Sequence, residues 1–179
     1  MILQNNSFQV HITIDDTYSI DSTDNIHFDV ILNPDHLSRT DRYRTADIII
    51  KDKGNKEWRI ALLGYYVNHA LLEDHKLSIL QDDKITRIDL RSFKILLHKP
   101  VNCFGSCLAI YPFMDGYLIH GELSILKTNK NLDIIWEFSG RDIFVTNNDK
   151  ESLTIKDNII QLYDWDNNYY ELDENGKLL

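Results

Sequence analysis

The stretch HKLSILQDDKITRIDL, residues 75–90, has a near copy in GELSILKTNKNLDIIW, residues 121–136. Aligned without gaps at an offset of 46, residues 62–90 match residues 108–136 at nine positions, including all four of each LSIL. A repeat of about 40–50 residues in a strand-rich chain is typical of propeller blades or stacked sheets. The repetition therefore predicts a fold built from similar β modules, each of which needs a neighbour to cover its apolar face.

Alternation of apolar and polar side chains indicates strands along most of the chain. In residues 7–14 every second side chain is apolar, a period typical of a half-buried strand. These apolar side chains are Phe8, Val10, Ile12 and Ile14. The stretch NIHFDVIL, residues 25–32, repeats the pattern through Ile26, Phe28 and Val30. We expect both stretches to be strands.

Turn residues separate the apolar stretches at intervals of about 8–12 residues, which favours an all-β fold. In KDKGNK, residues 51–56, Gly54 or Asn55 can take a positive φ and close a hairpin. One short helical turn is expected after Pro34. Residues 65–80 could line a helical face, but we expect strand, because their twin segment contains Gly116 and Gly121. Later strands are expected at 131–138, 143–146, 152–155, 159–165 and 169–173, with a turn at 147–151.

These patterns predict an all-β fold of antiparallel meanders that form a sandwich or barrel with an internal repeat. The alternative is a four-bladed propeller-like ring closed by the termini. Its units would be 16–61, 62–107, 108–153 and 154–179, the last completed by residues 1–15. For domains, we expect an N-terminal β region, residues 1–58, and a repeat-containing β region, residues 59–179, within one continuous domain.

Two segments resemble blade strands of the quinoprotein-type and WD-type propeller repeats. They are NLDIIWEFSGRDIF, residues 131–144, and IIQLYDWDNNYYELDENGKLL, residues 159–179. They are also similar to uncharacterised bacterial proteins that contain β repeats of this type. The resemblance covers residues 60–179, although YDW reverses the usual order of Trp and Asp and the Gly-His pair of the WD pattern is missing. It implies a repeat-built β fold and brings no catalytic residue.

Charge and hydropathy limit the classes of partner. The chain has 28 Asp and Glu against 19 Lys and Arg, a net charge of −9, and this sign repels a phosphate backbone. The basic stretch RTDRYR, residues 39–44, is interrupted by Asp41 and is expected to be a solvated loop. No apolar run approaches the roughly 20 residues of a membrane helix, and the first residues lack the pattern of a secretory signal. We therefore expect a cytoplasmic protein with neither nucleic-acid nor membrane partners.

The two cysteines raise the question of a metal site. Cys103 and Cys107 are spaced C-x3-C, with His98 before them and His120 after them. A zinc site would need these two histidines as its second ligand pair, which does not fit the usual H-x3–5-H spacing. We expect two thiols in a loop, with a reversible disulfide as the alternative in an oxidising compartment.

A second candidate metal site lies in DWDNNYYELDEN, residues 164–175. Asp164, Asp166 and Asn168 occupy alternate positions, as in a calcium-binding loop. Tyr169 stands where that loop needs Gly, and Asn175 stands where it needs a bidentate Glu. The stretch therefore predicts a tight turn, and we expect no metal and no cofactor.

Catalytic motifs are also missing from the sequence. It contains no nucleophile elbow, P-loop, G-x-G-x-x-G or H-E-x-x-H motif. Its seven histidines are scattered, and no pair among its 28 acidic residues is singled out for glycoside hydrolysis. We therefore predict no catalytic residue, and enzymatic activity stays an open question.

Aromatic residues near the C-terminus are the best candidates for binding. In IIQLYDW, residues 159–165, Tyr163 and Trp165 share one face of the expected strand, and Tyr169 follows after a turn. Either this strand is covered on both faces in a two-layer core, or its aromatic face contacts a protein partner, since Trp and Tyr dominate interface hot spots.

We predict a non-enzymatic protein-binding module for a basic partner, such as an inhibitor or immunity-type protein, through Tyr163, Trp165 and Tyr169. The alternative is a carbohydrate- or small-molecule-binding, or hydrolysing, β domain.

Overall fold

The computed structural model describes residues 1–147 and 150–179, with the side chains of Asp24 and Ile26 left undescribed. The chain forms two compact units, Met1–Pro100 (unit 1) and Val101–Leu179 (unit 2). The described residues form four open sheets, so the predicted all-β class is confirmed. The boundary expected after residue 58 falls inside a strand, β5 (Glu57–Gly64), and the one-domain organisation stays a prediction. Each unit is considered by itself below.

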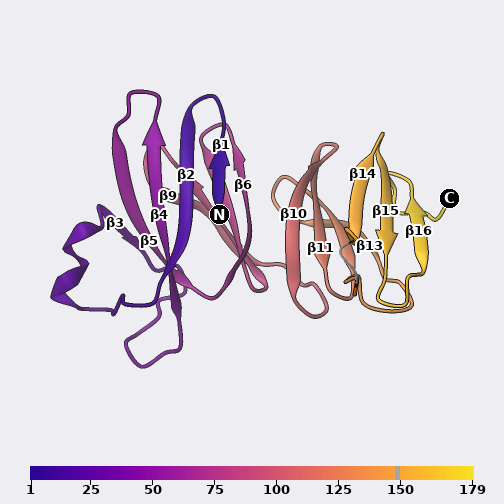
Figure 1. Cartoon of the computed structure of the whole chain (residues 1–179), viewed down its shortest axis with the longest axis horizontal. Coiled ribbons are helices and arrows are strands. Elements are labelled where there is room, and N and C mark those ends of the chain that lie inside the picture. Colours follow the sequence, from indigo (N-terminus) through magenta and orange to yellow (C-terminus); the bar gives the residue numbers. More distant parts are fainter. Residues whose placement is uncertain (148–149) are drawn as a thin grey trace. The chain divides into compact units, whose positions relative to one another are not determined.

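Unit 1 contains sheets A and B (Figure 1). Sheet A has the order β1–β2–β4–β5–β3, in which only β3 and β5 are parallel neighbours. Sheet B is the antiparallel meander β6–β7–β8–β9. The strands are Ile2–Gln4 (β1), Phe8–Asp15 (β2), Val30–Leu32 (β3), Arg44–Asp52 (β4), Glu57–Gly64 (β5), Val67–Glu73 (β6), Lys76–Gln81 (β7), Lys84–Asp89 (β8) and Lys94–Pro100 (β9). The strands expected in residues 65–80 are thus present as β6 and β7.

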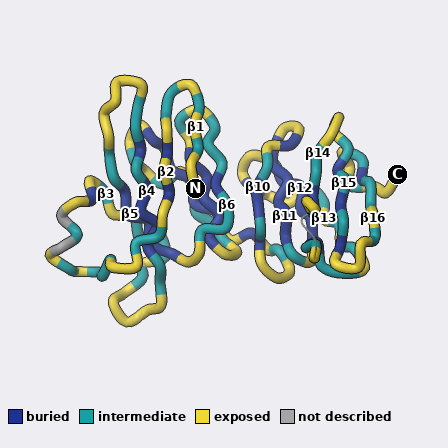
Figure 2. The backbone as a smooth tube through the Cα atoms, in the orientation of Figure 1, coloured by how far each residue is buried: buried dark blue, intermediate teal, exposed yellow. Residues whose placement is uncertain are grey.

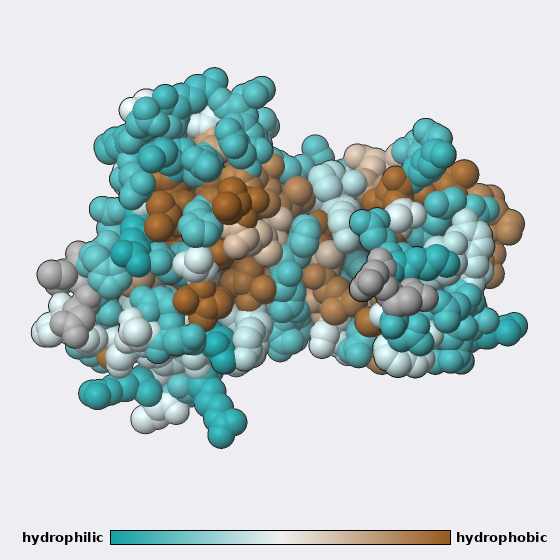
Figure 3. Space-filling view, viewed as in Figure 1, coloured by the Kyte–Doolittle hydropathy of each residue, from teal (hydrophilic) through white to brown (hydrophobic). Residues whose placement is uncertain are grey.

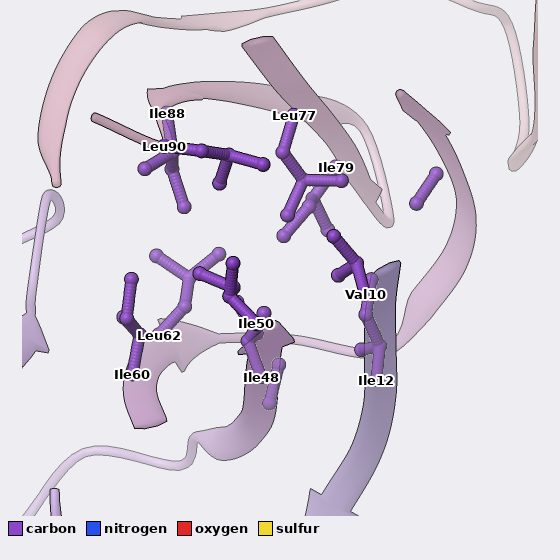
Figure 4. Packing of buried hydrophobic residues seen from close by; sticks show 12 residues of the cluster. Val10, Ile12, Ile48, Ile50, Ile60, Leu62, Leu77, Ile79, Ile88 and Leu90 are labelled. Atoms are coloured by element: carbon purple, nitrogen blue, oxygen red, sulfur yellow. The ribbon is translucent and has the colours of Figure 1, made fainter. Parts of the chain in front are cut away.

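The core of unit 1 lies between these two sheets. The alternation in β2 has the expected effect, because Val10 and Ile12 are buried while His11 between them is exposed. Figure 2 shows how buried and exposed stretches are distributed along the chain. Figure 4 shows aliphatic side chains of sheet A pointing toward those of sheet B. The buried cluster consists of Val10, Ile12, Ala46, Ile48, Ile50, Ile60, Leu62, Ala70, Leu77, Ile79, Ile88 and Leu90. Apolar burial of this kind is the main force that holds two sheets together.

The strand predicted over residues 25–32 is wrong in its first half. Thr23–His27 forms a 3-10 helix, and only Val30–Leu32 is strand. Polar residues close this short turn: the backbone N–H of Asn25 donates to Ser22 O (3.3 Å), and its side-chain Nδ2 donates to Ser19 O (2.7 Å). Such local side-chain bonds compete with strand pairing. The side chain of Ile26, part of the predicted pattern, lies outside the described residues.

The segments around this 3-10 helix cover part of the second face of sheet A. Phe28 packs there with Ala61 and Leu63 of β5, and half-buried side chains surround the three: Tyr18, Ile20, Leu37 and Tyr43. The helical turn expected after Pro34 is a simple hydrogen-bonded turn, with His36 N donating to Asn33 O (3.2 Å). Among the described residues, Thr23–His27 is thus the single helix, and it is far too short to span a bilayer.

Unit 2 contains sheets C and D. Sheet C is the antiparallel meander β10–β11–β12–β13, and sheet D is the shorter meander β14–β15–β16. The strands are Cys107–Phe113 (β10), Gly116–Gly121 (β11), Ile125–Asn129 (β12), Ile134–Phe138 (β13), Leu153–Lys156 (β14), Ile159–Tyr163 (β15) and Tyr169–Leu172 (β16). The turn predicted at residues 147–151 includes residues 148 and 149 and lies outside the described part.

Phe144 is central to the core of unit 2. The strand predicted at residues 143–146 is absent, and this segment has an irregular backbone. Phe144 is nevertheless fully buried between the sheets, 6.0 Å from the rings of both Phe138 and Tyr170. Its N–H donates to Glu122 O (2.7 Å), and its C=O accepts from His120 Nε2 (2.8 Å). The apolar stretch IFVT, residues 143–146, thus contains one side chain, Phe144, that inserts into the core. The stretch does not form a strand, because the backbone groups of Phe144 bond to a loop and to a side chain instead of to a neighbouring strand.

The internal repeat is present, but at a different offset from that of the sequence match. Sheets B and C are four-stranded meanders whose strands begin at Val67, Lys76, Lys84 and Lys94 and at Cys107, Gly116, Ile125 and Ile134, about 40 residues apart. Residues 77–80 lie in the second strand of sheet B, whereas residues 123–126 run into the third strand of sheet C. LSIL therefore does not mark equivalent strands: Leu77 is fully buried, whereas its counterpart Leu123 is 43% exposed and precedes the strand.

The ring closed by the termini is wrong in its strand pairing. That alternative needs residues 1–15 to complete the last sheet, but β2 pairs with β4 along its whole length. At the other end, Leu178 forms a bridge with Leu172 of β16. Each terminus therefore completes a sheet of its own unit.

Four hairpin turns share one hydrogen-bonding pattern. At Asp52, Asn129, Asp164 and Asp173, a side-chain oxygen accepts from the N–H four residues later, at 2.8–3.0 Å. In each turn the residue three positions later has a positive φ: Asn55, Leu132, Asn167 and Gly176. Short carboxylates and amides favour such turns because they replace a missing backbone partner. The hairpin expected at residues 51–56 is the first of these four turns.

Replacing Phe144 by Ala should lower the free energy of unfolding by about 3–5 kcal/mol, because the deleted ring leaves a cavity between sheets C and D. Urea denaturation followed by tryptophan fluorescence measures the change. Phe104→Ala is the matched control, since Phe104 is exposed and should shift stability by less than about 0.5 kcal/mol. Equal effects of the two substitutions would contradict the central position of Phe144.

Asp164→Asn should destabilise the protein by about 1–3 kcal/mol at neutral pH. The buried carboxylate accepts hydrogen bonds from Asn168 and Tyr170. In the variant, the NH2 group of the new amide would face these same donor groups. Burial raises the pKa of Asp164, but these hydrogen bonds outweigh burial and hold that pKa below its usual value of 3.8. The stabilisation is therefore complete above pH 3.8 and is lost as pH falls through the lower pKa of the folded state.

Urea midpoints of wild type and Asp164→Asn at pH 7, 5 and 3 test this dependence, and the gap between the two proteins should narrow at the lowest pH. Asp157→Asn, at an exposed turn of the same sheet, serves as control. A gap that stays constant with pH would show that the charge of Asp164 does not contribute.

Candidate functional site

Sheet D has one buried face and one face that carries polar and aromatic side chains. Since opposite residues in an antiparallel pair share a face, the pairing of Leu153 with Leu162, and of Leu162 with Tyr170, defines the buried face. The other face is called the tyrosine face here. It consists of Thr154, Lys156, Ile159, Gln161, Tyr163, Tyr169 and Glu171.

Tyr163 and Tyr169 form the centre of the tyrosine face. They are direct cross-strand partners, and their ring centroids lie 4.9 Å apart at 37°. The ammonium of Lys150 lies 3.8 Å from the centroid of the Tyr163 ring, a cation–π contact. Tyr169 is 46% exposed, so a partner could reach this pair.

A row of hydrogen bonds orients the rest of this face. Thr154 Oγ1 donates to Gln161 Oε1 (3.3 Å), and Gln161 Nε2 donates to Glu171 Oε1 (3.0 Å). The Tyr169 hydroxyl also donates to Glu171, and this bond raises the pKa of Tyr169 to about 12 and lowers the pKa of Glu171. The face therefore presents an ordered carboxylate beside two phenol rings.

Trp165 does not share the strand position predicted for it. β15 ends at Tyr163, and Trp165 lies in the following turn, where its backbone N–H donates to Ile143 O (2.9 Å). Its side chain is 44% exposed. Of the three predicted contact residues, the structure brings together Tyr163 and Tyr169, whereas Trp165 lies beyond the end of the strand.

Three residues at this face were not expected from the sequence: Lys150, Gln161 and Glu171. Gln161 and Glu171 could have been found, because each lies two residues from a selected tyrosine and two-residue spacing places side chains on one face. Lys150 carried no local signal, since it reaches Tyr163 from the segment before β14.

The residues of the calcium hypothesis serve the turn. Asp164 is fully buried, with its carboxylate accepting from the Asn168 N–H (2.8 Å), Asn168 Nδ2 (2.9 Å) and the Tyr170 hydroxyl (2.8 Å). Asn167 between them has a φ of 62°. The carboxylate oxygens of Asp164 are thus directed toward protein donors.

The residues of the zinc hypothesis have other partners. Cys103 and Cys107 form a disulfide, with their Cα atoms 5.8 Å apart, instead of the two thiols that we expected. His120 is buried against Phe144 O, and burial lowers its pKa. Nε2 of His98 lies 3.1 Å from Asp35 Oδ1.

Asp35 and His98 belong to a polar cluster in unit 1 that no local sequence pattern predicts. Lys84 Nζ lies 2.6 Å from Asp35 Oδ1, and Thr86 Oγ1 lies 3.0 Å from His98 Nδ1. Burial raises the pKa of Asp35, but the bonds from Lys84 and His98 outweigh burial and lower it. The hydroxyl–imidazole–carboxylate order resembles a catalytic triad, yet Thr86 is fully buried and cannot meet a substrate. The cluster ties the segment after β3 to sheet B.

Charge is distributed unevenly along the chain. Unit 2 has 13 Asp and Glu against 6 Lys and Arg, a balance of −7, whereas unit 1 has 15 against 13, a balance of −2. The negative charge is therefore concentrated in the unit that carries the tyrosine face.

Figure 3 shows apolar surface near β1 and β2 of unit 1, where Met1 and Ile2 are exposed.

Comparison with known proteins identifies the fold. No protein-family model and no curated protein matches this sequence. Among solved structures, BamB from Moraxella catarrhalis is similar over 73% of this chain and 42% of its own, at a TM-score of 0.54 and 14% identity. The computationally designed Ika8 protein is similar over 80% of this chain and 46% of its own, at a TM-score of 0.54 and 11% identity.

This likeness supports the propeller-like β resemblance seen in the sequence. The chain spans less than half the length of both structures. At such low identity the likeness shows the fold alone, and a fold of this kind hosts many functions.

Reducing the Cys103–Cys107 disulfide should lower the free energy of unfolding by about 2 kcal/mol, the loop-entropy value for a closed loop of five residues. Urea denaturation with and without dithiothreitol measures this change. The double variant Cys103→Ser/Cys107→Ser should match the reduced wild type and should not respond to dithiothreitol. Wild-type stability that is unaffected by the reductant would contradict a stabilising bond.

Proposed function

We propose that the protein is a non-enzymatic binding module for a basic protein and that it binds this partner through the tyrosine face of sheet D. The observation that carries the proposal is the coincidence of an ordered tyrosine pair, of which Tyr169 is exposed and Tyr163 half-buried, with the unit that has a balance of −7. Tyrosines are frequent hot spots in interfaces, and complementary charge accelerates association and discriminates between partners.

The chemistry of the face supports a cationic partner. The Lys150 ammonium on the Tyr163 ring shows that this ring face holds a cation, and a Lys or Arg of a partner would take the same position by displacing Lys150. Hydrogen bonds from Gln161 and Tyr169 hold Glu171 beside the rings. The Glu171 side chain therefore loses little conformational entropy when it binds a positive charge of a partner. The mode of action would be that of an inhibitor or immunity-type protein that neutralises a basic target.

The lineage and the compartment are part of this proposal. We propose that the sheets derive from blades of quinoprotein or WD type and that the protein is bacterial and cytoplasmic. In the cytoplasm the two cysteines would be held as thiols, whereas an oxidising compartment would preserve the disulfide. Thiol labelling of protein isolated from its native cells distinguishes the two compartments.

Capture from a lysate of the source cells, followed by calorimetry with the purified captured protein, tests the proposed function. The double variant Tyr163→Ala/Tyr169→Ala should weaken the affinity for a basic partner by at least about tenfold, because it removes two aromatic anchors. Tyr66→Ala, at an exposed tyrosine of unit 1, is the matched control and should bind as wild type does.

Two results would contradict the proposal. One is a captured protein that binds the wild type and the double variant equally. The other is a saturating thermal stabilisation by a sugar in a glycan screen, which would favour the carbohydrate-binding alternative.

A further inference from the structure

A groove of about 360 Å³ lies in unit 2 at one end of sheet C. It is lined by Met114, Asp115, Lys127, Ile135, Trp136, Glu174 and Asn175. These residues come from the β10–β11 hairpin, from β12 and β13, and from the turn after β16. Its size is near the lower limit of ligand pockets, which suits a side chain better than a folded element.

Trp136 forms a fixed wall of this groove. Its Nε1 donates to Glu174 O (3.0 Å), which binds the indole to the turn after β16. Gly176 of the same turn lies against the ring, because a Cβ there would be 2.7 Å from the indole carbons. The aromatic surface is thus held in place before any ligand arrives.

Two exposed apolar side chains, Met114 and Ile135, extend this wall, and each is 54% exposed. Met114 has a φ of 51°, a conformation in which Asn and Asp are much more frequent. In the corresponding hairpin of sheet B, Asp74 has the same conformation, with a φ of 49°. An apolar residue in this position of sheet C places a flexible hydrophobic chain at the mouth of the groove.

The charged groups of the groove sum to one negative charge. Lys127 is buried, and its ammonium is shared between Phe113 O (2.9 Å), Thr128 O (3.1 Å) and Asp115 Oδ1 (3.1 Å). Its three protons are therefore used, and its bond to Asp115 lowers the pKa of that carboxyl. Lys130 acts on Asp115 from farther away. The exposed carboxylate of Glu174 leaves the balance of the lining groups at −1.

From this combination we infer that the groove binds an arginine side chain of the basic partner, an inference that rests on the proposed function. The methylene stem would lie along Met114, Ile135 and Trp136, and the guanidinium would meet Glu174 and Asp115. Arginine fits better than lysine because its planar head pairs with carboxylates in a bidentate way.

Titration of the full chain with the peptide acetyl-Gly-Arg-Gly-amide tests this inference, with the neutral citrulline analogue as control. The three indole N–H signals in a ¹H–¹⁵N spectrum report on Trp58, Trp136 and Trp165 separately. We expect a saturable shift at Trp136 with the arginine peptide and none with the citrulline peptide at equal concentration.

Glu174→Gln should weaken the binding of the peptide about fivefold, the effect of losing one partly exposed ion pair. Glu137→Gln is the matched control, since it makes the same charge change next to Trp136 on β13 and does not line the groove. Both positions are exposed, so neither substitution should disturb the fold.

Three outcomes would overturn the groove inference: no saturable shift at Trp136, equal binding of the two peptides, or equal effects of the two Glu substitutions. A shift confined to Trp165 would place the cation elsewhere in unit 2 and would leave the proposed function intact. A captured partner that is lost on Tyr163→Ala/Tyr169→Ala but not on Glu174→Gln would separate the two proposals in the same way.

Discussion

The structure depends on the burial of one apolar face of each sheet against a second sheet. An isolated meander would leave its apolar face in water, which is unfavourable. In unit 1, sheets A and B solve this problem with a continuous aliphatic cluster. In unit 2, sheets C and D do so with a cluster in which Phe144 fills the space that two small sheets leave open. The positions of Tyr163, Tyr169 and Glu171 follow from which face sheet D had to bury.

Acidic side chains have two roles in unit 2. Asp164 and Asp173 close hairpins by accepting backbone N–H groups, and hydrogen bonding lowers the pKa of both. Such carboxylates stabilise turns and are not available in full to a partner. The carboxylate of Glu174 is exposed, and that of Glu171 lies on the tyrosine face. Both are better placed than the turn carboxylates to contact a partner. The balance of −7 is thus partly a consequence of a fold with many short turns and partly a property of the surface.

The likeness to propeller-type structures gives an architecture and no activity. Repeated sheets of this kind offer a rigid support on which side chains at strand faces and hairpin ends can vary. The tyrosine face and the groove beside Trp136 both lie at such positions. Both are preorganised by hydrogen bonds within the chain, which favours binding because little side-chain freedom is left to lose.

The sequence by itself determined the strand class and the hairpin at residues 51–56, because alternation and turn chemistry are local, whereas the pairing of Tyr163 with Tyr169 came from the structure. The sequence also showed that similar modules recur, although the LSIL match gave the wrong offset. Only the tertiary structure decided that Phe144 leaves the strand pattern to fill a core, that Asp35 meets His98, and that Trp136 lies against the C-terminal turn. These contacts join residues far apart in the chain, and their free energy comes from burial and pairing that no local pattern records.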